Sequence, residues 1–106
     1  MHNKYNNRKM KTSEGTFDSM HEYRRWQELK LLLRAGEIKD LERQVKYELI
    51  PKQDGERAIC YVADFVYIDT RTGEKVVEDA KGKKTDAYII KRKLMLYRHG
   101  IKVKET

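Results

Sequence analysis

The sequence has only one cysteine, one proline and one tryptophan among 106 residues. A single cysteine, Cys60, cannot form an intrachain disulfide, and disulfides are rare in the reducing cytoplasm but common in small secreted domains. We therefore expect a cytoplasmic protein whose stability depends on one modest hydrophobic core, because a chain of this length has little area to bury.

Long hydrophobic runs are also absent from the sequence. No apolar stretch approaches the ~18 residues that a membrane-spanning helix needs, so we expect no membrane partner. The N-terminal residues MHNKYNNRKMKTSEGT are basic, but no apolar segment of the kind found in signal peptides follows them. We interpret residues 1–15 as a flexible basic arm and residues 16–106 as a single domain.

Positive charge is in excess: 24 lysines and arginines face 17 acidic residues, which gives a net charge of +7 and a pI near 9.5. Such a balance favours a polyanionic partner, most often nucleic acid. The plainer alternative is a protein that is simply basic. Global disorder is unfavoured, because the apolar residues recur with the periods of helices and strands.

Helical spacing is clearest around Trp26, Leu29 and Leu33, which form one apolar stripe. Four residues before Trp26, the same stripe contains Glu22, which we therefore expect on the core-facing side near the helix N-terminus. An alternative is a capping box, in which the Glu22 carboxylate would reach back to the Ser19 amide.

The predicted elements give an α+β (mixed α/β) domain in the order α-β-β-β-α-β, with a central sheet flanked by helices. Turn residues and changes of hydrophobic period mark their limits. The elements are a helix over residues 17–35, strands over 44–50, 57–68 and 75–81, a helix over 85–99 with a stripe of Ala87, Ile90, Leu94 and Tyr97, and a strand over 101–104.

One carboxylate interrupts the most apolar strand, RAICYVADFVYI at residues 57–68, which we expect to be central and covered on both faces. A four-residue loop at 70–73 would place Asp79 of the returning strand directly opposite Asp64. Lys81 would then share the face of Asp79, whereas Glu78 would point away and be a bystander. A register slip of one residue would break this pairing.

Two opposed carboxylates repel each other, and a cation between them explains their placement. Oxygen ligands suit a hard ion, Mg²⁺ or Mn²⁺, which keeps several waters and binds one or two carboxylates. With Lys81 beside a metal-bound water, such a site suits phosphodiester hydrolysis. The alternative is that Lys81 only neutralises Asp79 or Asp64 in a structural ion pair.

Asp64, a hairpin of about fifteen residues, and the run 79–81 after a helix bearing Glu22 resemble the PD-(D/E)xK nuclease superfamily. More narrowly, the segments TFDSMHEYRRW, QVKYEL, YVADFVY, VEDAKG and YIIKRKL are similar to a family of small phage-encoded proteins with that predicted fold, over roughly residues 16–105. One departure is Ala63, which stands where the superfamily motif has proline.

The resemblance implies a restriction-endonuclease-like core and a role for each matching residue. Asp64 and Asp79 would bind the metal ion, at a site that also includes Ala80. Lys81 would lie beside the attacking water, and Glu22 would be a further metal ligand, directly or through water.

Basic residues that follow this site are predicted to contact DNA phosphates. The alternative is that they form a solvated helix face. They are Lys83, Lys84, Lys91, Arg92, Lys93 and Arg98.

Together these features predict an Mg²⁺-dependent DNA endonuclease that acts on branched DNA, such as a Holliday junction, or on duplex DNA. The resemblance implies a role in phage recombination or replication, in the cytoplasm of a bacterial host. Symmetric cutting would require two active sites and hence a homodimer. Two alternatives stay open: a non-catalytic nucleic-acid-binding module, and a phage regulatory protein that binds a partner protein.

Overall fold

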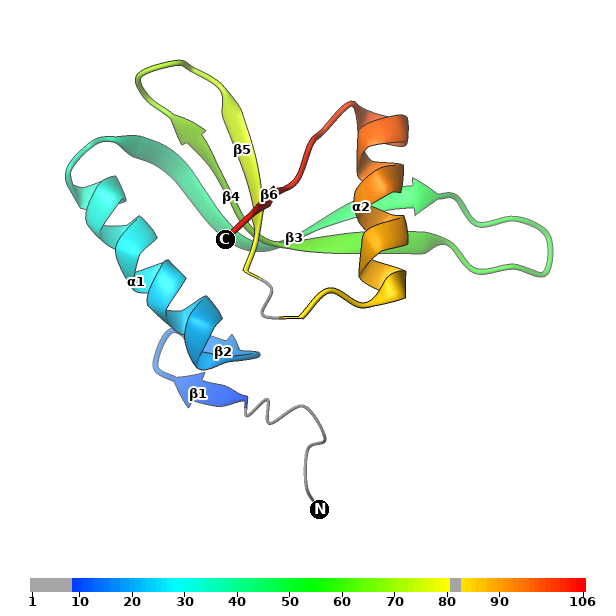
Figure 1. Ribbon diagram of the computed structural model, residues 1–106, viewed down its shortest axis with the longest axis horizontal. Helices are drawn as coiled ribbons and strands as arrows, with labels where there is room; N and C mark the ends of the chain where they lie inside the picture. The colour runs from blue at the N-terminus through cyan, green and yellow to red at the C-terminus, as the bar shows by residue number, and fades with distance from the viewer. Residues whose placement is uncertain (1–8, 81–82) are drawn as a thin grey trace.

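The computed structural model describes residues 9–80 and 83–106 (Figure 1). The protein has an α+β fold whose six main elements follow the predicted order α-β-β-β-α-β, after a small N-terminal hairpin. The elements are β1 (Met10–Thr12), β2 (Gly15–Phe17), α1 (Met20–Arg34), β3 (Ile38–Ile50), β4 (Ile59–Asp69), β5 (Lys75–Asp79), α2 (Asp86–His99) and β6 (Lys104–Glu105).

The main sheet has the strand order β3-β4-β5-β6. The first three strands are antiparallel, and β6 adds to β5 in parallel. The predicted register of the second hairpin is confirmed, since Phe65 faces Glu78 and Ile68 faces Lys75. Continuing that register by one residue brings Asp64 opposite Asp79, as the sequence predicted.

Strand β3 begins six residues earlier than predicted, at Ile38, and pairs with β4 in a long hairpin that projects from the body (Figure 1). Its course is irregular. Asp40 and Gln44 both have left-handed backbones, with φ of 54° and 55°, and the register shifts between Lys39 and Glu42. Left-handed backbone is unusual for residues other than glycine and often marks functional sites.

Helix α1 is capped as predicted, with the Ser19 hydroxyl accepting a hydrogen bond from the Glu22 amide at 3.2 Å. Leu29 and Glu22 are buried on its inner face. The predicted stripe was wrong at its end, however. Leu33 is 41% exposed, and Leu32 packs against the core in its place.

Helix α2 has the predicted limits, with Thr85 as its N-cap and Gly100 in the left-handed conformation at its end. Its predicted apolar stripe was only partly right, since Leu94 packs against the core but Ile90 and Tyr97 do not. Tyr88 and Met95 are buried, whereas Ile90 and Tyr97 are 58% and 88% exposed. The helix therefore meets the sheet with a face rotated from the predicted one.

The two helices cover different parts of the sheet (Figure 1). Tyr61 and Ala63 belong to the core cluster that contains Met95 of α2, whereas Phe65 belongs to the cluster that contains Leu29 of α1. Asp64 lies at the changeover between these clusters, where a polar side chain can be accommodated. The first part of β4 is less covered than predicted, since Ile59 and Val62 are 42% and 43% exposed.

The predicted flexible arm extended too far, because β1 and β2 pair in an antiparallel hairpin that includes residues 10–15. Phe17 at the end of this hairpin is fully buried. The Arg43 guanidinium lies over the Phe17 ring, 3.8 Å from its centroid, and would clash with a side chain at Gly15. The hairpin is therefore part of the folded domain, and residues 1–8 lie outside the described residues.

Candidate active site

Asp64 and Asp79 line one open pocket of about 320 Å³. The pocket forms because β5 pairs with β4 only from Phe65 to Ile68, which leaves the first half of β4 beside the N-terminal end of α2. The structure thus brings together the two carboxylates that the hairpin register predicted. Other residues that line the pocket are Asp18, Gln44, Cys60, Tyr61, Val62, Thr85, Ala87, Tyr88 and Lys91.

Asp79 is only 1% exposed, and its Oδ2 accepts a hydrogen bond from the Tyr61 hydroxyl at 2.5 Å. Burial, together with this bond, raises the pKa of Tyr61 far above its usual range. Tyr61 therefore stays protonated and serves as a fixed donor that orients the Asp79 carboxylate.

Asp64 is held in place by hydrogen bonds from its neighbours, one of them the residue directly after Asp79. Its Oδ2 accepts a hydrogen bond from the main-chain amide of Ala80 at 2.8 Å, and its Oδ1 lies 3.5 Å from the Gln44 side-chain nitrogen. Ala80, which the resemblance placed in the metal site, is buried. In this structure its amide donates to a carboxylate and fixes β5 against β4.

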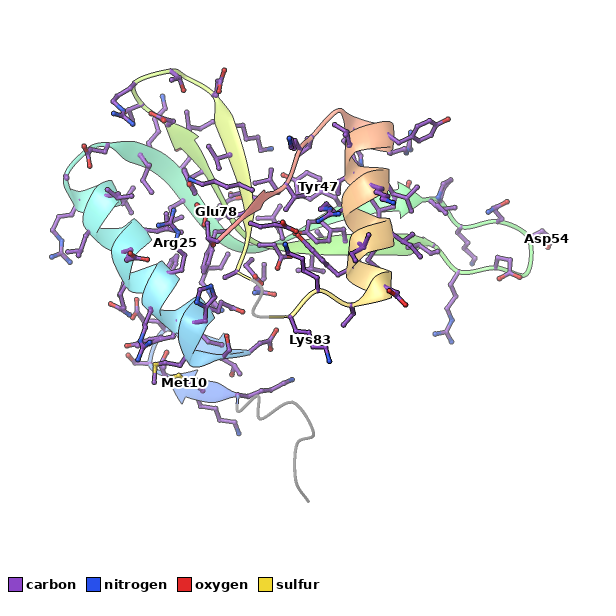
Figure 2. The ribbon with its side chains drawn as sticks, in the orientation of Figure 1. Met10, Arg25, Tyr47, Asp54, Glu78 and Lys83 are labelled. Carbon is purple, nitrogen blue, oxygen red and sulfur yellow. The ribbon has the colours of Figure 1, made fainter. Side chains whose placement is uncertain are left out.

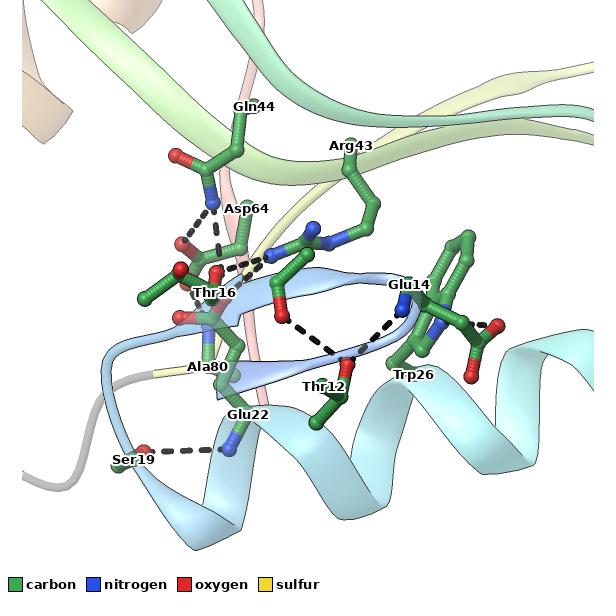
Figure 3. A network of polar contacts seen from close by, with 11 residues as sticks. Thr12, Glu14, Thr16, Ser19, Glu22, Trp26, Arg43, Gln44, Asp64 and Ala80 are labelled. Carbon is green, nitrogen blue, oxygen red and sulfur yellow. Dashed lines mark hydrogen bonds and ion pairs between the residues drawn. The ribbon is translucent and has the colours of Figure 1, made fainter. Parts of the chain in front are cut away.

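Glu22 reaches this site from helix α1. Its side chain is 2% exposed, and its Oε2 lies 3.3 Å from Arg43 and 3.5 Å from the Gln44 nitrogen (Figure 3). Gln44 thus bridges Glu22 and Asp64, and their two contacting oxygens are at most 7.0 Å apart, twice 3.5 Å. Burial and the nearby Asp18 carboxylate raise the pKa of Glu22.

Of the two contacts that define a capping box, the structure shows only the one made by the Ser19 side chain. The Ser19 hydroxyl caps the helix, but the Glu22 carboxylate points to Arg43 and Gln44. The position of Glu22 is therefore set by contacts with β3.

Glu78 points away from Asp79, as predicted, but it is not a bystander. It is fully buried, and Arg25 of α1 donates two hydrogen bonds to it, both at 2.8 Å (Figure 2). Tyr67 donates another through its hydroxyl. Burial alone would raise the pKa of Glu78, but the bonds from Arg25 and Tyr67 outweigh it and lower that pKa. Glu78 therefore joins β5 to α1.

The predicted DNA-contacting residues occupy different surroundings. Lys91 lines the pocket, whereas Lys84 and Arg92 contact the Glu105 carboxylate at 3.2 and 2.9 Å. Lys83 is exposed. Lys81, the predicted catalytic lysine, lies outside the described residues.

The ligand atoms at this site are of the type that a hard cation prefers, but few protein side chains supply them. Asp64 and Asp79 present carboxylate oxygens to one pocket, and Mg²⁺ typically binds one or two carboxylates and several waters. Within residues 9–80 and 83–106, no group of three or more His, Cys, Asp or Glu side chains is arranged to hold a metal ion. A metal ion here would therefore depend on two carboxylates and on water for its remaining ligands.

Two polar residues of this site were not predicted from the sequence. Gln44 stands opposite Asp64 in the β3–β4 register, and Tyr61 lies three residues before Asp64 on the same strand. The register of the first hairpin would have revealed Gln44, but the long loop at its tip does not define that register. Tyr61 had no signal beyond its place in an apolar strand.

By fold and site, the protein is a small α+β domain with an acidic pocket between its central strands and helix α2. The chain belongs to the family described as protein of unknown function DUF1064, whose model matches residues 2–106. No curated protein and no solved structure matches it. Neither helix in the described part of the chain is long and apolar enough to cross a membrane.

Proposed function

We propose that the protein is a metal-dependent DNA endonuclease of the PD-(D/E)xK type. The observation that carries this proposal is the convergence of Asp64 and Asp79 from facing strands on one open pocket. Burying a carboxylate is costly, and active sites are among the places where proteins retain such groups. The net charge of +7 favours a polyanionic substrate.

In the proposed mechanism, Asp64 and Asp79 would hold the cation, and Glu22 would contribute to the site directly or through water. When bound, Mg²⁺ or Mn²⁺ would polarise the scissile phosphate and lower the pKa of a bound water. Tyr61 keeps the Asp79 carboxylate oriented, and the Ala80 amide does the same for Asp64.

Lys81 carries the role that the resemblance assigns, beside the attacking water. Lys91, which lines the pocket from α2, is positioned to contact the substrate phosphate. We further propose branched DNA as the substrate and a homodimer as the active form, because two symmetric cuts require two sites. The phage setting rests on the resemblance alone.

A non-catalytic nucleic-acid-binding module is the second candidate. It is favoured by one observation, namely that Asp64 and Asp79 already accept hydrogen bonds from Ala80 and Tyr61 within the fold. In that function the carboxylates would be structural, and the basic residues of α2 would bind the DNA backbone.

Cleavage assays separate the two candidates. Supercoiled, linear and four-way-junction DNA are incubated with Mg²⁺ or Mn²⁺ and either wild type or the variants Asp64→Asn, Asp79→Asn and Lys81→Ala. We expect each variant to lower cleavage at least about a hundredfold, the scale of a lost metal or water contact. Asp54→Asn, at the exposed tip of the β3–β4 hairpin (Figure 2), is the matched control and retains wild-type cleavage.

A gel-shift measurement completes the comparison. If wild type and variants are equally inactive while DNA still shifts, the enzyme proposal is wrong and the binding module stands. If DNA neither shifts nor is cut, both nucleic-acid functions are wrong, and a protein partner is the remaining candidate.

A further inference from the structure

We propose that Lys84, Tyr88 and Arg92 form a binding site for one phosphate of the DNA backbone, which the Glu105 carboxylate occupies in the DNA-free protein. This inference rests on the proposed function for the identity of the anion. It adds to that function an internal competitor for DNA.

The geometry is that of an anion site. One oxygen of Glu105, Oε2, accepts hydrogen bonds from the Tyr88 hydroxyl at 2.7 Å and from Arg92 Nη1 at 2.9 Å. The other oxygen, Oε1, lies 3.2 Å from Lys84 Nζ. Arginine, lysine and tyrosine are also common donors to DNA phosphates, and carboxylate and phosphate oxygens accept in similar directions.

The location joins this site to the candidate active site. Tyr88 lines the pocket that contains Asp64 and Asp79, and Glu105 of β6 pairs directly with Asp79 of β5. A DNA strand with its scissile phosphate in the pocket would therefore bring a neighbouring phosphate to Lys84 and Arg92. Binding there would help fix the position of the strand for cleavage.

The contacts of Glu105 are of a kind that a DNA phosphate could replace. The side chains of Lys84, Arg92 and Glu105 are 50%, 32% and 27% exposed, and partly exposed ion pairs contribute little to stability. Hydrogen bonds from Tyr88 and Arg92 lower the pKa of Glu105 to about 2, so the carboxylate is charged at any neutral pH. An incoming phosphate must therefore replace a full negative charge.

A purely structural role for Glu105 makes the opposite prediction. If Glu105 served only to hold Lys84 and Arg92 in place for DNA, its neutralisation would release those side chains and weaken binding. If Glu105 competes with phosphate, its neutralisation strengthens binding. The sign of the effect therefore separates the two roles.

The test measures binding of the full chain to a short labelled DNA duplex by fluorescence anisotropy, without divalent metal. Glu105→Gln keeps the shape of the side chain and removes its charge. Asp54→Asn removes the same charge at the distant hairpin tip and controls for net charge. We expect Glu105→Gln to bind at least about threefold tighter than Asp54→Asn, with a plot of log affinity against log salt steeper by about one phosphate contact.

Double variants show which residues cause the expected gain in DNA affinity. Lys84→Ala and Arg92→Ala, each combined with Glu105→Gln, should abolish the gain in affinity. In the wild-type background, Lys84→Ala should weaken binding more than Lys52→Ala, which removes a lysine at the hairpin tip. Equal affinities for Glu105→Gln and Asp54→Asn, or weaker binding by Glu105→Gln, would overturn the proposal.

The outcome is independent of catalysis, since the assay contains no metal and detects no cleavage. If Glu105→Gln binds tighter while wild type cleaves no DNA, the phosphate site stands and the nuclease proposal fails. If wild type cleaves DNA but Glu105→Gln shows no gain, the nuclease proposal stands and the phosphate site fails.

Discussion

At the scale of single residues, Glu22 is the side chain whose burial most clearly costs free energy of folding. It is buried on α1, and its Oε2 lies 3.3 Å from the Arg43 guanidinium. Burial and Asp18 raise the pKa of Glu22 above its ordinary value of 4.5. A carboxyl whose pKa is raised by folding stabilises the protein when it is protonated. That stabilisation is complete below the ordinary pKa and is lost as pH rises through the raised one.

The first prediction concerns Glu22→Gln in metal-free protein. The variant keeps the size of the side chain and cannot ionise, so its melting temperature relative to wild type should increase as pH rises from 4 to 7. Metal-dependent cleavage should fall at least about tenfold, because the acid that contributes to the metal site is lost. Thermal unfolding followed by circular dichroism across this pH range, with Asp54→Asn as control, measures the first effect. A melting temperature of Glu22→Gln below that of wild type at pH 7 would show that the Arg43 pair is net stabilising.

Gln44 is the residue that connects the acidic groups. Its amide lies between Glu22 and Asp64, and its backbone has a left-handed φ of 55°. Left-handed backbone costs a non-glycine residue roughly 1–2 kcal/mol, and such strain persists where surrounding structure holds it. Here the β3–β4 pairing on both sides of Gln44 supplies that support.

Individual site residues were predictable where local rules fix them. Asp64 and Asp79 could be paired from sequence because a four-residue turn defines the register of β4 and β5. The helical period placed Glu22 inward. Gln44 was not predictable, because its role depends on a register between strands joined by a long loop and on a backbone conformation that no local signal encodes.

At the scale of elements, strand β5 connects the site to both helices. Glu78 faces α1 and binds Arg25, whereas the next residue, Asp79, faces the pocket beside α2. Arg25 lies three residues after Glu22, and residues at this spacing share one face of a helix. The Arg25–Glu78 pair therefore fixes the helix that carries Glu22 relative to the strand that carries Asp79.

The second prediction is a double-mutant cycle on this pair. Arg25→Met and Glu78→Met should each destabilise the protein by about 3 kcal/mol or more, because each leaves a buried charge without its partner. The double variant should recover much of that loss, because two methionines bury well. Urea unfolding at neutral pH measures the three free energies of unfolding. Additive effects of the two single changes would contradict a direct coupling.

The limits of the two helices followed the sequence closely, whereas the start of β3 and the packing faces did not. Ser19, Thr85 and Gly100 set the helix ends by local capping geometry that the sequence displays. The buried face of α2, with Tyr88 and Met95, depends on how the twisted sheet meets the helix, which helical periodicity alone does not determine. The β1–β2 hairpin escaped prediction because its strands are three residues long and polar.

At the scale of the whole molecule, the fold is flat, with extents of 47 × 41 × 21 Å. Its two helices cover different parts of one sheet (Figure 1). The acidic pocket is lined by Asp64 and Asp79 of the sheet and by Tyr88 and Lys91 of α2. Four acidic residues are buried in the described part of the chain: Glu22, Asp64, Glu78 and Asp79. A chain of 106 residues has a small free energy of unfolding. With four buried acidic residues, the melting temperature of the metal-free protein should respond to a bound cation that neutralises their charge.

The last prediction concerns the effect of a bound metal ion on this small margin of stability. A ligand that binds only the folded state stabilises it, by about 2.7 kcal/mol when its concentration is a hundred times its dissociation constant. For a domain of this size, such a gain raises the melting temperature by roughly 10 °C or more. We therefore expect Mn²⁺ to raise the melting temperature of wild type and of Asp54→Asn, measured by circular dichroism. Asp79→Asn, which keeps an acceptor for Tyr61 but loses a ligand charge, should show little of this rise. A wild type that melts at the same temperature with and without Mn²⁺ would have no resident metal site, and the acidic pocket would then be structural.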